Sequence, residues 1–551
     1  MDRNEHLYRL YQDELQALNE FVMSYSLDHK YAGLKNGQSN DDPDVLRLLE
    51  ALAFFSARTQ DVAQRNITSY RYRLYQQLFP YLLCPVPPFG IMRATHTGAL
   101  TEPVFLERGT EFVLENDQGS EYFFQTRASV HVFPIFLREI KATLVAGSSH
   151  TISFSIQSRH IQHNVPDQLS FYIDYIGDLD SSYRILGFFR NKIEKARVSY
   201  EKETAIERHW IDVPQLAFGS IPLRIDENDH MHPIEIERMF LNDPRGELFL
   251  HVSLPTPTHS YNDITIEFDF IEAWPKGLVL NTDIFQLHCI PVVNLKKSPS
   301  NPMLIDGSKT QFPILHSQPT SGYTFHKAIG VYRIDGTALK PLVPGILKNI
   351  DGSFEIDESK VMDDGRSVTY LNVHFPSAFE YPVTVFVDAM WSQRSFLEDK
   401  DRKSNIKPYS RNILGVQWDW IALPKSRASL RDVDNRDDVL LNIVYISQKR
   451  YYSYEDMLSI FDVLGPLSQG PFKKVHQAFK GLRYELRSVD GSTLTAGYVL
   501  YFMDFNWDIV DHESELFNVF ISHLEFVLNS WSSEREIRLS LDLSDDLPVK
   551  R

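Results

Sequence analysis

The chain has 551 residues with 43% hydrophobic and 23% charged side chains, a composition typical of a folded protein of about three to four domains. Its formal net charge of -17 argues against nucleic-acid binding, because affinity for phosphate groups comes largely from lysine and arginine. Two cysteines cannot form a disulfide framework and fit a reducing compartment. Without a signal-peptide pattern or a membrane-length apolar window, a soluble, cytoplasmic protein with no direct membrane insertion is expected.

The first 90 residues have the pattern of α-helices. Apolar residues recur at three- and four-residue steps over 5–25 and again over 43–62, where the apolar face is broad enough to be buried on two sides. A separate helical run is predicted over 67–78. Pro80 ends this run, and the prolines of residues 85–88 favour an extended exit.

From residue 91 onward, short alternating runs predict strands. Residues 151–156 and 264–270 alternate strictly between apolar and polar side chains, which is typical of half-buried strands. A short helix is predicted near residues 181–190. The charged, aperiodic segment 398–411 is interpreted as an exposed loop or linker.

The C-terminal part mixes helices and strands. Ser453, followed by the acidic Glu455 and Asp456, predicts the start of a helix that ends at Gly465. The predicted fold class is therefore α+β and β-rich, with β-sandwich-like domains in the centre. The expected domains are a helical assembly module at 1–90, β-rich domains at 91–280 and 281–430, and an α+β domain at 431–551.

Motifs that carry catalysis or bind metals are missing from the sequence. It contains no Walker-type phosphate loop and no Gly-x-Ser-x-Gly, His-Glu-x-x-His or Cys-x-x-Cys pattern. His230 and His232 with Glu235 could offer metal ligands, but no further ligand lies at a defined spacing, so a turn without a metal is favoured. Acidic residues 432–438 lack the glycine and glutamate positions of an EF-hand loop. We expect no catalytic residues, no metal site and no cofactor.

An enzymatic alternative stays open at this point. A carbohydrate-active β-sandwich enzyme would use a pair of carboxylates from distant strands, and such a pair leaves no local motif. That enzyme would show a deep pocket with converging carboxylates, whereas a structural subunit would not.

Four segments resemble one known family. Residues 42–58 contain Asp-Pro-Asp-Val, Arg-Leu-Leu-Glu-Ala-Leu-Ala-Phe and Ala-Arg, and residues 78–87 contain Leu-Phe-Pro-Tyr-Leu and Pro-Val-Pro. Residues 106–112 read Leu-Glu-Arg-Gly-Thr-Glu-Phe, and residues 285–303 contain Pro-Val-Val-Asn-Leu and Asn-Pro-Met. In this order and spacing, the segments resemble TssF (ImpG/VasA), the baseplate subunit family of type VI secretion systems.

The resemblance implies a non-enzymatic structural protein of a contractile, phage-tail-like injection system. In the family, two TssF copies and one TssG subunit build a baseplate wedge that binds TssK and TssE. This wedge complex is the platform for tube and sheath assembly and for effector delivery. The resemblance also implies a bacterial cytoplasmic location, at a baseplate docked on the inner membrane.

The N-terminal helices carry more apolar surface than they can bury against each other. We therefore expect them to pack against a TssG-like subunit or a second TssF copy. The residues expected at this protein interface are Leu10, Tyr11, Leu18, Leu48, Leu49, Leu52, Phe55, Leu78, Phe79 and Tyr81.

Overall fold

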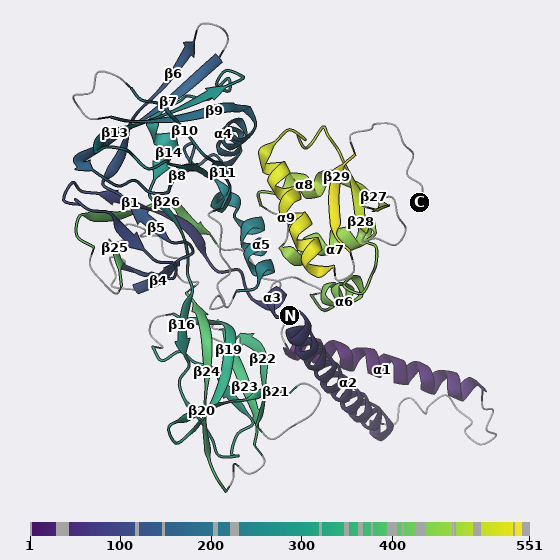
Figure 1. The fold of residues 1–551 in the computed structure, drawn as a ribbon. Coiled ribbons are helices and arrows are strands. Elements are labelled where there is room, and N and C mark those ends of the chain that lie inside the picture. The colour runs from purple at the N-terminus through teal and green to yellow at the C-terminus, as the bar shows by residue number, and fades with distance from the viewer. Residues whose placement is uncertain are drawn as a thin grey trace.

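The computed structural model shows an α+β, strand-rich protein (Figure 1). It describes residues 3–28, 43–115, 121–145, 149–201, 208–220, 231–318, 322–345, 352–361, 367–375, 378, 380–393, 405–409, 413–425, 436–465, 467, 470–488, 497–532 and 535–542. Two long helices project from a β-rich body, and a C-terminal domain of helices and strands lies beside that body (Figure 1). The predicted fold class is confirmed.

The two long helices form the N-terminal part. α1 (Arg3–Asp28) and α2 (Pro43–Leu78) pack against each other, and the short α3 (Pro80–Leu83) follows. Pro43 begins α2, because the first turn of a helix does not need its missing N–H. The expectation of a separate helical run over 67–78 is wrong. No glycine or proline occurs within residues 44–79, so α2 continues without a break.

A six-stranded sheet combines strands from three distant parts of the chain. Its order is β25 (Asn405–Pro408), β3 (Glu111–Glu115), β4 (Glu121–Thr126), β15 (Cys289–Val293), β1 (Phe89–His96) and β26 (Val416–Lys425). β1 lies inside this sheet and pairs antiparallel with both β15 and β26. Met92, Phe124 and Ile290 belong to its buried core. Strands from both sides of the expected domain boundary at residue 280 therefore share one sheet.

Two further sheets and a helix surround one part of the largest buried cluster, which continues into the C-terminal helices and strands. One sheet has the order β10 (Ile211–Asp212), β9 (Ile193–Glu201), β13 (Tyr261–Phe270), β7 (Ser149–Gln162) and β6 (Ile135–Val145). The other has the order β11 (Leu216–Phe218), β12 (Phe249–Ser253), β8 (Gln168–Ile173) and β14 (Phe285–Leu287). The alternation in β7 and β13 buries Phe154, Ile266 and Phe268. α4 (Leu179–Lys192) confirms the helix predicted near residues 181–190.

A helix and a strand lie where the sequence pattern predicts a turn and an exposed loop. α5 (Pro233–Asn242) begins after His232, whose Nδ1 accepts a hydrogen bond from the backbone N–H of Ile234 at 3.2 Å. The interpretation of His232 as part of a turn is therefore wrong, because the residue caps a helix; His230 lies outside the described residues. Residues 405–408, expected in an exposed loop, form β25 and pair with β3. A four-residue strand is too short to show periodicity.

Residues 296–392 form a β domain of two sheets with a common core. One sheet has the order β16 (Lys296–Pro299), β24 (Val383–Ser392), β19 (Thr324–Asp335) and β20 (Ala338–Pro341), and β17 (Met303–Ile305) also pairs with β24. The other has the order β18 (Gln311–Pro313), β23 (Ser367–His374), β22 (Ser353–Val361) and β21 (Val343–Pro344). Val331, Leu371 and Trp391 are buried between them. A short pair, β2 (Val104–Leu106) and β5 (Val130–Val132), lies elsewhere in the body.

The C-terminal domain packs helices around a three-stranded sheet. The strands are β27 (Phe479–Ser488), β28 (Gly497–Phe505) and β29 (Ile537–Leu541), and the helices are α6 (Arg436–Ile446), α7 (Tyr454–Leu464), α8 (Lys473–Ala478) and α9 (Glu515–Trp531). The predicted cap of α7 is confirmed. The Ser453 hydroxyl accepts from the Asp456 N–H at 3.3 Å, and the Asp456 carboxylate accepts from the Ser453 N–H at 2.8 Å.

His288 lies between β14 and β15, where the chain passes from one sheet to another. Its φ of 54° is in the left-handed region that few residues other than glycine adopt. The buried ring accepts a hydrogen bond at Nε2 from the Phe133 N–H at 3.2 Å, so the imidazole is neutral there. Burial, together with the nearby His96, lowers the pKa of His288 to about 3.

This histidine should make the protein less stable in mild acid. An unfolded histidine has a pKa of about 6.5, so between that pH and about 3 the unfolded chain binds a proton that the folded chain does not. The stability from the neutral ring is complete above pH 6.5 and falls by about 1.4 kcal/mol per pH unit below it, or about 2 kcal/mol by pH 5.

Denaturant titrations at pH 7 and pH 5 should show this loss in the wild type and a smaller loss in His288→Asn. Asparagine tolerates the backbone conformation. His131, exposed on β5, supplies the control His131→Asn, which should keep the wild-type loss. An unchanged loss in His288→Asn would contradict this assignment.

Candidate functional site: the α2 surface and the joint at its base

α1 covers one side of α2. The covered side contains the fully buried Ala53 and Ala57, and small side chains at this four-residue step allow two helices to approach closely. The Ser56 hydroxyl donates to the Glu14 carboxylate of α1 at 2.8 Å. The broad apolar face predicts a helix buried on two sides, but within the described residues α1 covers only one of them.

The opposite side of α2 is apolar and exposed. Leu48, Leu52, Phe55 and Val62 follow one another at steps of four, three and seven residues, so they share one helix face. Their side chains are between 48% and 65% exposed. We call these four residues the α2 apolar face. Contiguous apolar surface of this kind usually marks a site of interaction with another protein.

The structure divides the residues expected at the interface into exposed, half-buried and buried sets. Exposed are Leu48, Leu52, Phe55 and Leu78. Half-buried are Leu10, Tyr11, Leu18 and Tyr81. Buried within this chain are Leu49 and Phe79. Six further apolar residues of α2 are exposed but are not in the expected set: Leu46, Phe54, Val62, Ile67, Tyr70 and Leu74. Of these, Val62 continues the seven-residue spacing from Phe55.

The C-terminal end of α2 is anchored on two other parts of the fold. The Arg73 guanidinium forms an ion pair with Glu355 of β22 at 2.9 Å, and Gln76 Nε2 donates to the Ile356 carbonyl at 3.0 Å. On another side, Tyr75 packs with Leu440 of α6 in a small buried cluster. The free, apolar part of α2 therefore projects from a base that is held in place.

Below this base, residues 82–88 form a buried joint between α2 and β1. The guanidinium of Arg238 on α5, itself 2% exposed, donates to the carbonyls of Tyr81 at 2.7 Å and Cys84 at 2.9 Å. The Asn294 N–H donates to the Pro88 carbonyl at 2.8 Å. The chain leaving the helices is thus held by hydrogen bonds from two other segments as well as by its prolines.

A cavity of about 770 Å³ lies beside the joint, between α2, α3, the start of α5, β19 and β22. Glu235 and Glu355 are the carboxylates that line it, and each is paired with a cation. Lys327 Nζ lies 2.7 Å and 2.8 Å from the two Glu235 oxygens, and Arg73 pairs with Glu355. A carboxylate pair for glycoside hydrolysis would need one group to give up a proton and the other to attack or activate water. The cavity therefore gives the carbohydrate-active alternative no support.

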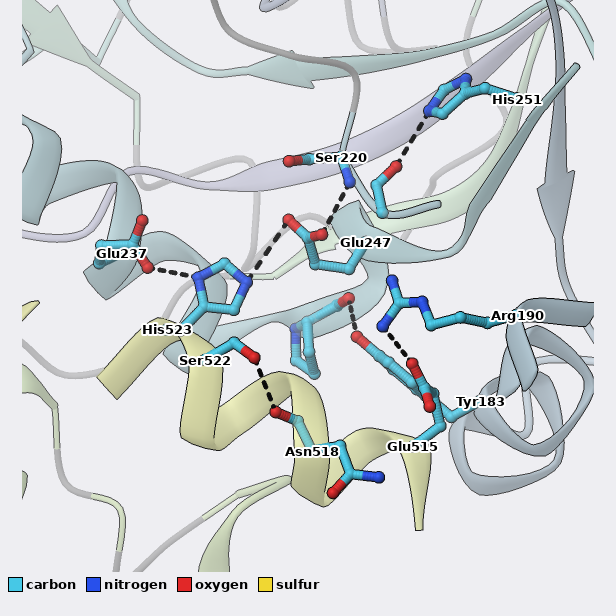
Figure 2. A network of polar contacts seen from close by, with 12 residues as sticks. Tyr183, Arg190, Ser220, Glu237, Glu247, His251, Glu515, Asn518, Ser522 and His523 are labelled. Carbon is cyan, nitrogen blue, oxygen red and sulfur yellow. Dashed lines mark hydrogen bonds and ion pairs between the residues drawn. The ribbon is translucent and has the colours of Figure 1, made fainter. Parts of the chain in front are cut away.

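A polar network joins the C-terminal domain to the body (Figure 2). His523 of α9 lies between Glu237 of α5 and Glu247 of the short helix η1 (Pro244–Glu247), with its Nε2 3.7 Å from Glu247, and its ring stacks on Phe240 at 3.5 Å. At the start of α9, the buried Glu515 pairs with Arg190 of α4. Three elements of the body thus hold one helix of the C-terminal domain.

Comparison with known proteins relates these features to a family. Residues 3–216 match the family model described as type VI secretion system, TssF. The type VI secretion system component TssF1 of Pseudomonas aeruginosa is 27% identical over 140 residues. That alignment covers 24% of this chain and 23% of the length of the relative.

Two solved structures share the fold. A chain of the cryo-electron microscopy structure of the type VI secretion system TssK-TssF-TssG baseplate subcomplex matches with a TM-score of 0.71 and 14% identity, over 92% of this chain and 100% of that one. A chain of the baseplate complex from the type VI secretion system matches with a TM-score of 0.61 and 13% identity, over 97% and 96%. Among the described residues, no helix is long and apolar enough to cross a membrane. The N-terminal part of the chain is thus similar to the TssF family of the type VI secretion system, and the chain shares the fold of a subunit of the baseplate subcomplex.

Proposed function

We propose that this chain is a structural subunit of a type VI secretion baseplate and that it assembles with TssG and TssK. The fold supports this proposal, because it matches a chain of a TssK-TssF-TssG subcomplex over nearly the whole length of both chains. The observation that carries it is the α2 apolar face. A helix that projects from a rigid base and exposes an apolar stripe is suited to being one member of an intermolecular helix bundle.

The proposed contact of the α2 apolar face is a helix of TssG or of a second TssF copy. Side chains at steps of four, three and seven residues form the seam that packs against another helix. Fully burying one large aliphatic or aromatic side chain contributes about 1.5–3 kcal/mol. The four side chains are about half exposed, so burying the rest of each contributes about half of that value, or about 3–6 kcal/mol for the α2 apolar face. Leu49 and Phe79 are left out of this surface because they are already buried within the chain.

We further propose that the chain has no catalytic role and that its wedge also contacts a TssE-like protein. The proposed location is the cytoplasmic baseplate at the inner membrane, where the wedge would support tube and sheath assembly. The ion pairs at Glu235 and Glu355 support a structural role, because in the cavity beside the joint they hold segments together.

Co-expression tests this proposal. The tagged full-length chain, expressed with TssG from the same genome, should co-purify with it and co-elute in size-exclusion chromatography, with more copies of this chain than of TssG. Adding TssK should shift the complex to a larger size. Each protein expressed alone is the control. If both proteins are soluble and elute separately at micromolar concentration, the proposed role is wrong.

A further inference from the structure

Three metal-binding side chains from distant parts of the sequence meet beside the joint. Cys84 follows α3, Glu235 lies in the first turn of α5, and His326 is on β19. The Cys84 sulfur, a Glu235 carboxylate oxygen and a His326 ring nitrogen all lie within 4.8 Å of one another. All three residues are buried, with exposures of 7%, 7% and 2%, and all three line the cavity described above.

We propose that Cys84, Glu235 and His326 bind one zinc ion, with the cavity side left for a fourth ligand such as water. Thiolate, imidazole and carboxylate are the three protein ligands that Zn²⁺ accepts, at about 2.0–2.3 Å. Ligand atoms around a tetrahedral ion are then about 3.5 Å apart, so the side chains need to close by about 1 Å. Calcium and magnesium are disfavoured because they take oxygen ligands.

Cys84 would bind the metal as a thiolate. Arg238 donates to the Cys84 carbonyl at 2.9 Å, which places a buried guanidinium next to this residue. The Cys84 thiol now donates to the Pro80 carbonyl at 3.2 Å, and binding would release that proton to solvent through the cavity.

Lys327 is the competitor for this site. Its Nζ contacts both oxygens of Glu235, but a carboxylate offers about four lone-pair positions, so one oxygen can still reach a metal. The ammonium and the metal repel each other across the carboxylate. Removing the lysine charge should therefore tighten metal binding.

A bound ion would connect α3 at the end of the helical part, α5 in the body and β19 in the β domain of residues 296–392. It would act as a clip at the point where the projecting helices meet the rest of the chain, because metal binding stabilises the folded arrangement of its ligands. The clip is independent of the proposed baseplate role and needs no partner protein.

Metal analysis of the full-length chain tests this site. Protein purified without chelators and without immobilised-metal affinity chromatography should contain one zinc ion per chain, measured by inductively coupled plasma mass spectrometry. Replacement with Co²⁺ should produce the intense near-ultraviolet charge-transfer band of a cobalt–thiolate bond. Cys84→Ser should lose the band and most of the metal, and Lys327→Met should bind Co²⁺ more tightly than the wild type.

Cys289→Ser is the matched control, because Cys289 is the other cysteine and lies buried in β15 away from the three ligands. This variant should keep the band and the metal. His326→Gln offers a second variant that should lose metal if Cys84→Ser folds poorly. Trace zinc in the wild type with no charge-transfer band on adding Co²⁺, or a band that survives Cys84→Ser, would overturn the proposal.

Discussion

The double substitution Leu52→Glu and Phe55→Glu should abolish co-purification with TssG while the chain stays folded. Both side chains lie on the α2 apolar face and are 50% and 65% exposed, so glutamate causes no burial penalty within the chain. In the assembled helix bundle, each substitution would remove about 1–2 kcal/mol of apolar burial, because each side chain is already partly buried in the free chain, and would add the cost of desolvating a charge. The sum exceeds 3 kcal/mol, which corresponds to at least a hundredfold weaker affinity. Size-exclusion chromatography with TssG measures assembly, and thermal unfolding of the variant alone measures its folding.

Gln60→Glu with Gln64→Glu is the matched control. These residues are exposed on the same helix, outside the α2 apolar face, and the two variants carry the same added charge. The control should co-elute with TssG as the wild type does. Because the contact is apolar, the wild-type complex should also survive about 0.5 M salt, where charges separated by more than a few ångströms are screened. Wild-type co-elution of the Leu52 and Phe55 variant, with the same number of copies of this chain per TssG, would show that the α2 apolar face contacts neither TssG nor a second copy.

Replacing Pro85, Pro87 and Pro88 together with Gly and Ser residues should leave the TssG complex intact but sharply reduce effector delivery in cells. All three prolines are buried, and the joint they form connects the α2 base to β1. Replacing each proline raises the entropy of the unfolded chain and costs about 0.4–1 kcal/mol of folding stability, so the three substitutions together cost about 1–3 kcal/mol. A softer joint transmits less of any movement of the projecting helices to the body. Killing of competitor bacteria measures delivery, and immunoblotting measures the amount of the variant.

The alternative is that these prolines only end a helix. In that case the substituted joint would still be held by Arg238 and Asn294, and delivery would be unchanged. The exposed prolines Pro299 and Pro341, replaced by Ser, are the control for loss of proline as such and should not affect delivery. Normal delivery by the joint variant, at normal protein levels, would remove the mechanical role.

Local patterns in the sequence determined the helices that carry the α2 apolar face. The step of three to four residues between apolar side chains predicted α1 and α2, and Ser453 with Asp456 predicted the start of α7. These features were readable because a helix brings residues together that are only three or four positions apart. The segments at 42–58 and 285–303 also resemble the TssF family, because short motifs are readable in the sequence without the fold.

The tertiary structure alone decided which apolar residues stay exposed. Leu48 and Leu49 are neighbours with the same side chain, yet Leu48 is 63% exposed and Leu49 is 8% exposed, because α1 covers only one side of the helix. The sequence predicted an apolar face too broad for one contact. It could not indicate which part α1 would take.

Long-range contacts decided the rest. β1 pairs with strands that begin about 200 and 330 residues further along, and Cys84, Glu235 and His326 meet from three separate elements. In the sequence, the only sign of a site at Glu235 is its nearness to His232, which instead caps α5. Helical and strand periods relate residues within one element, whereas pairing and cavity geometry depend on how elements pack, and no spacing in the chain encodes that.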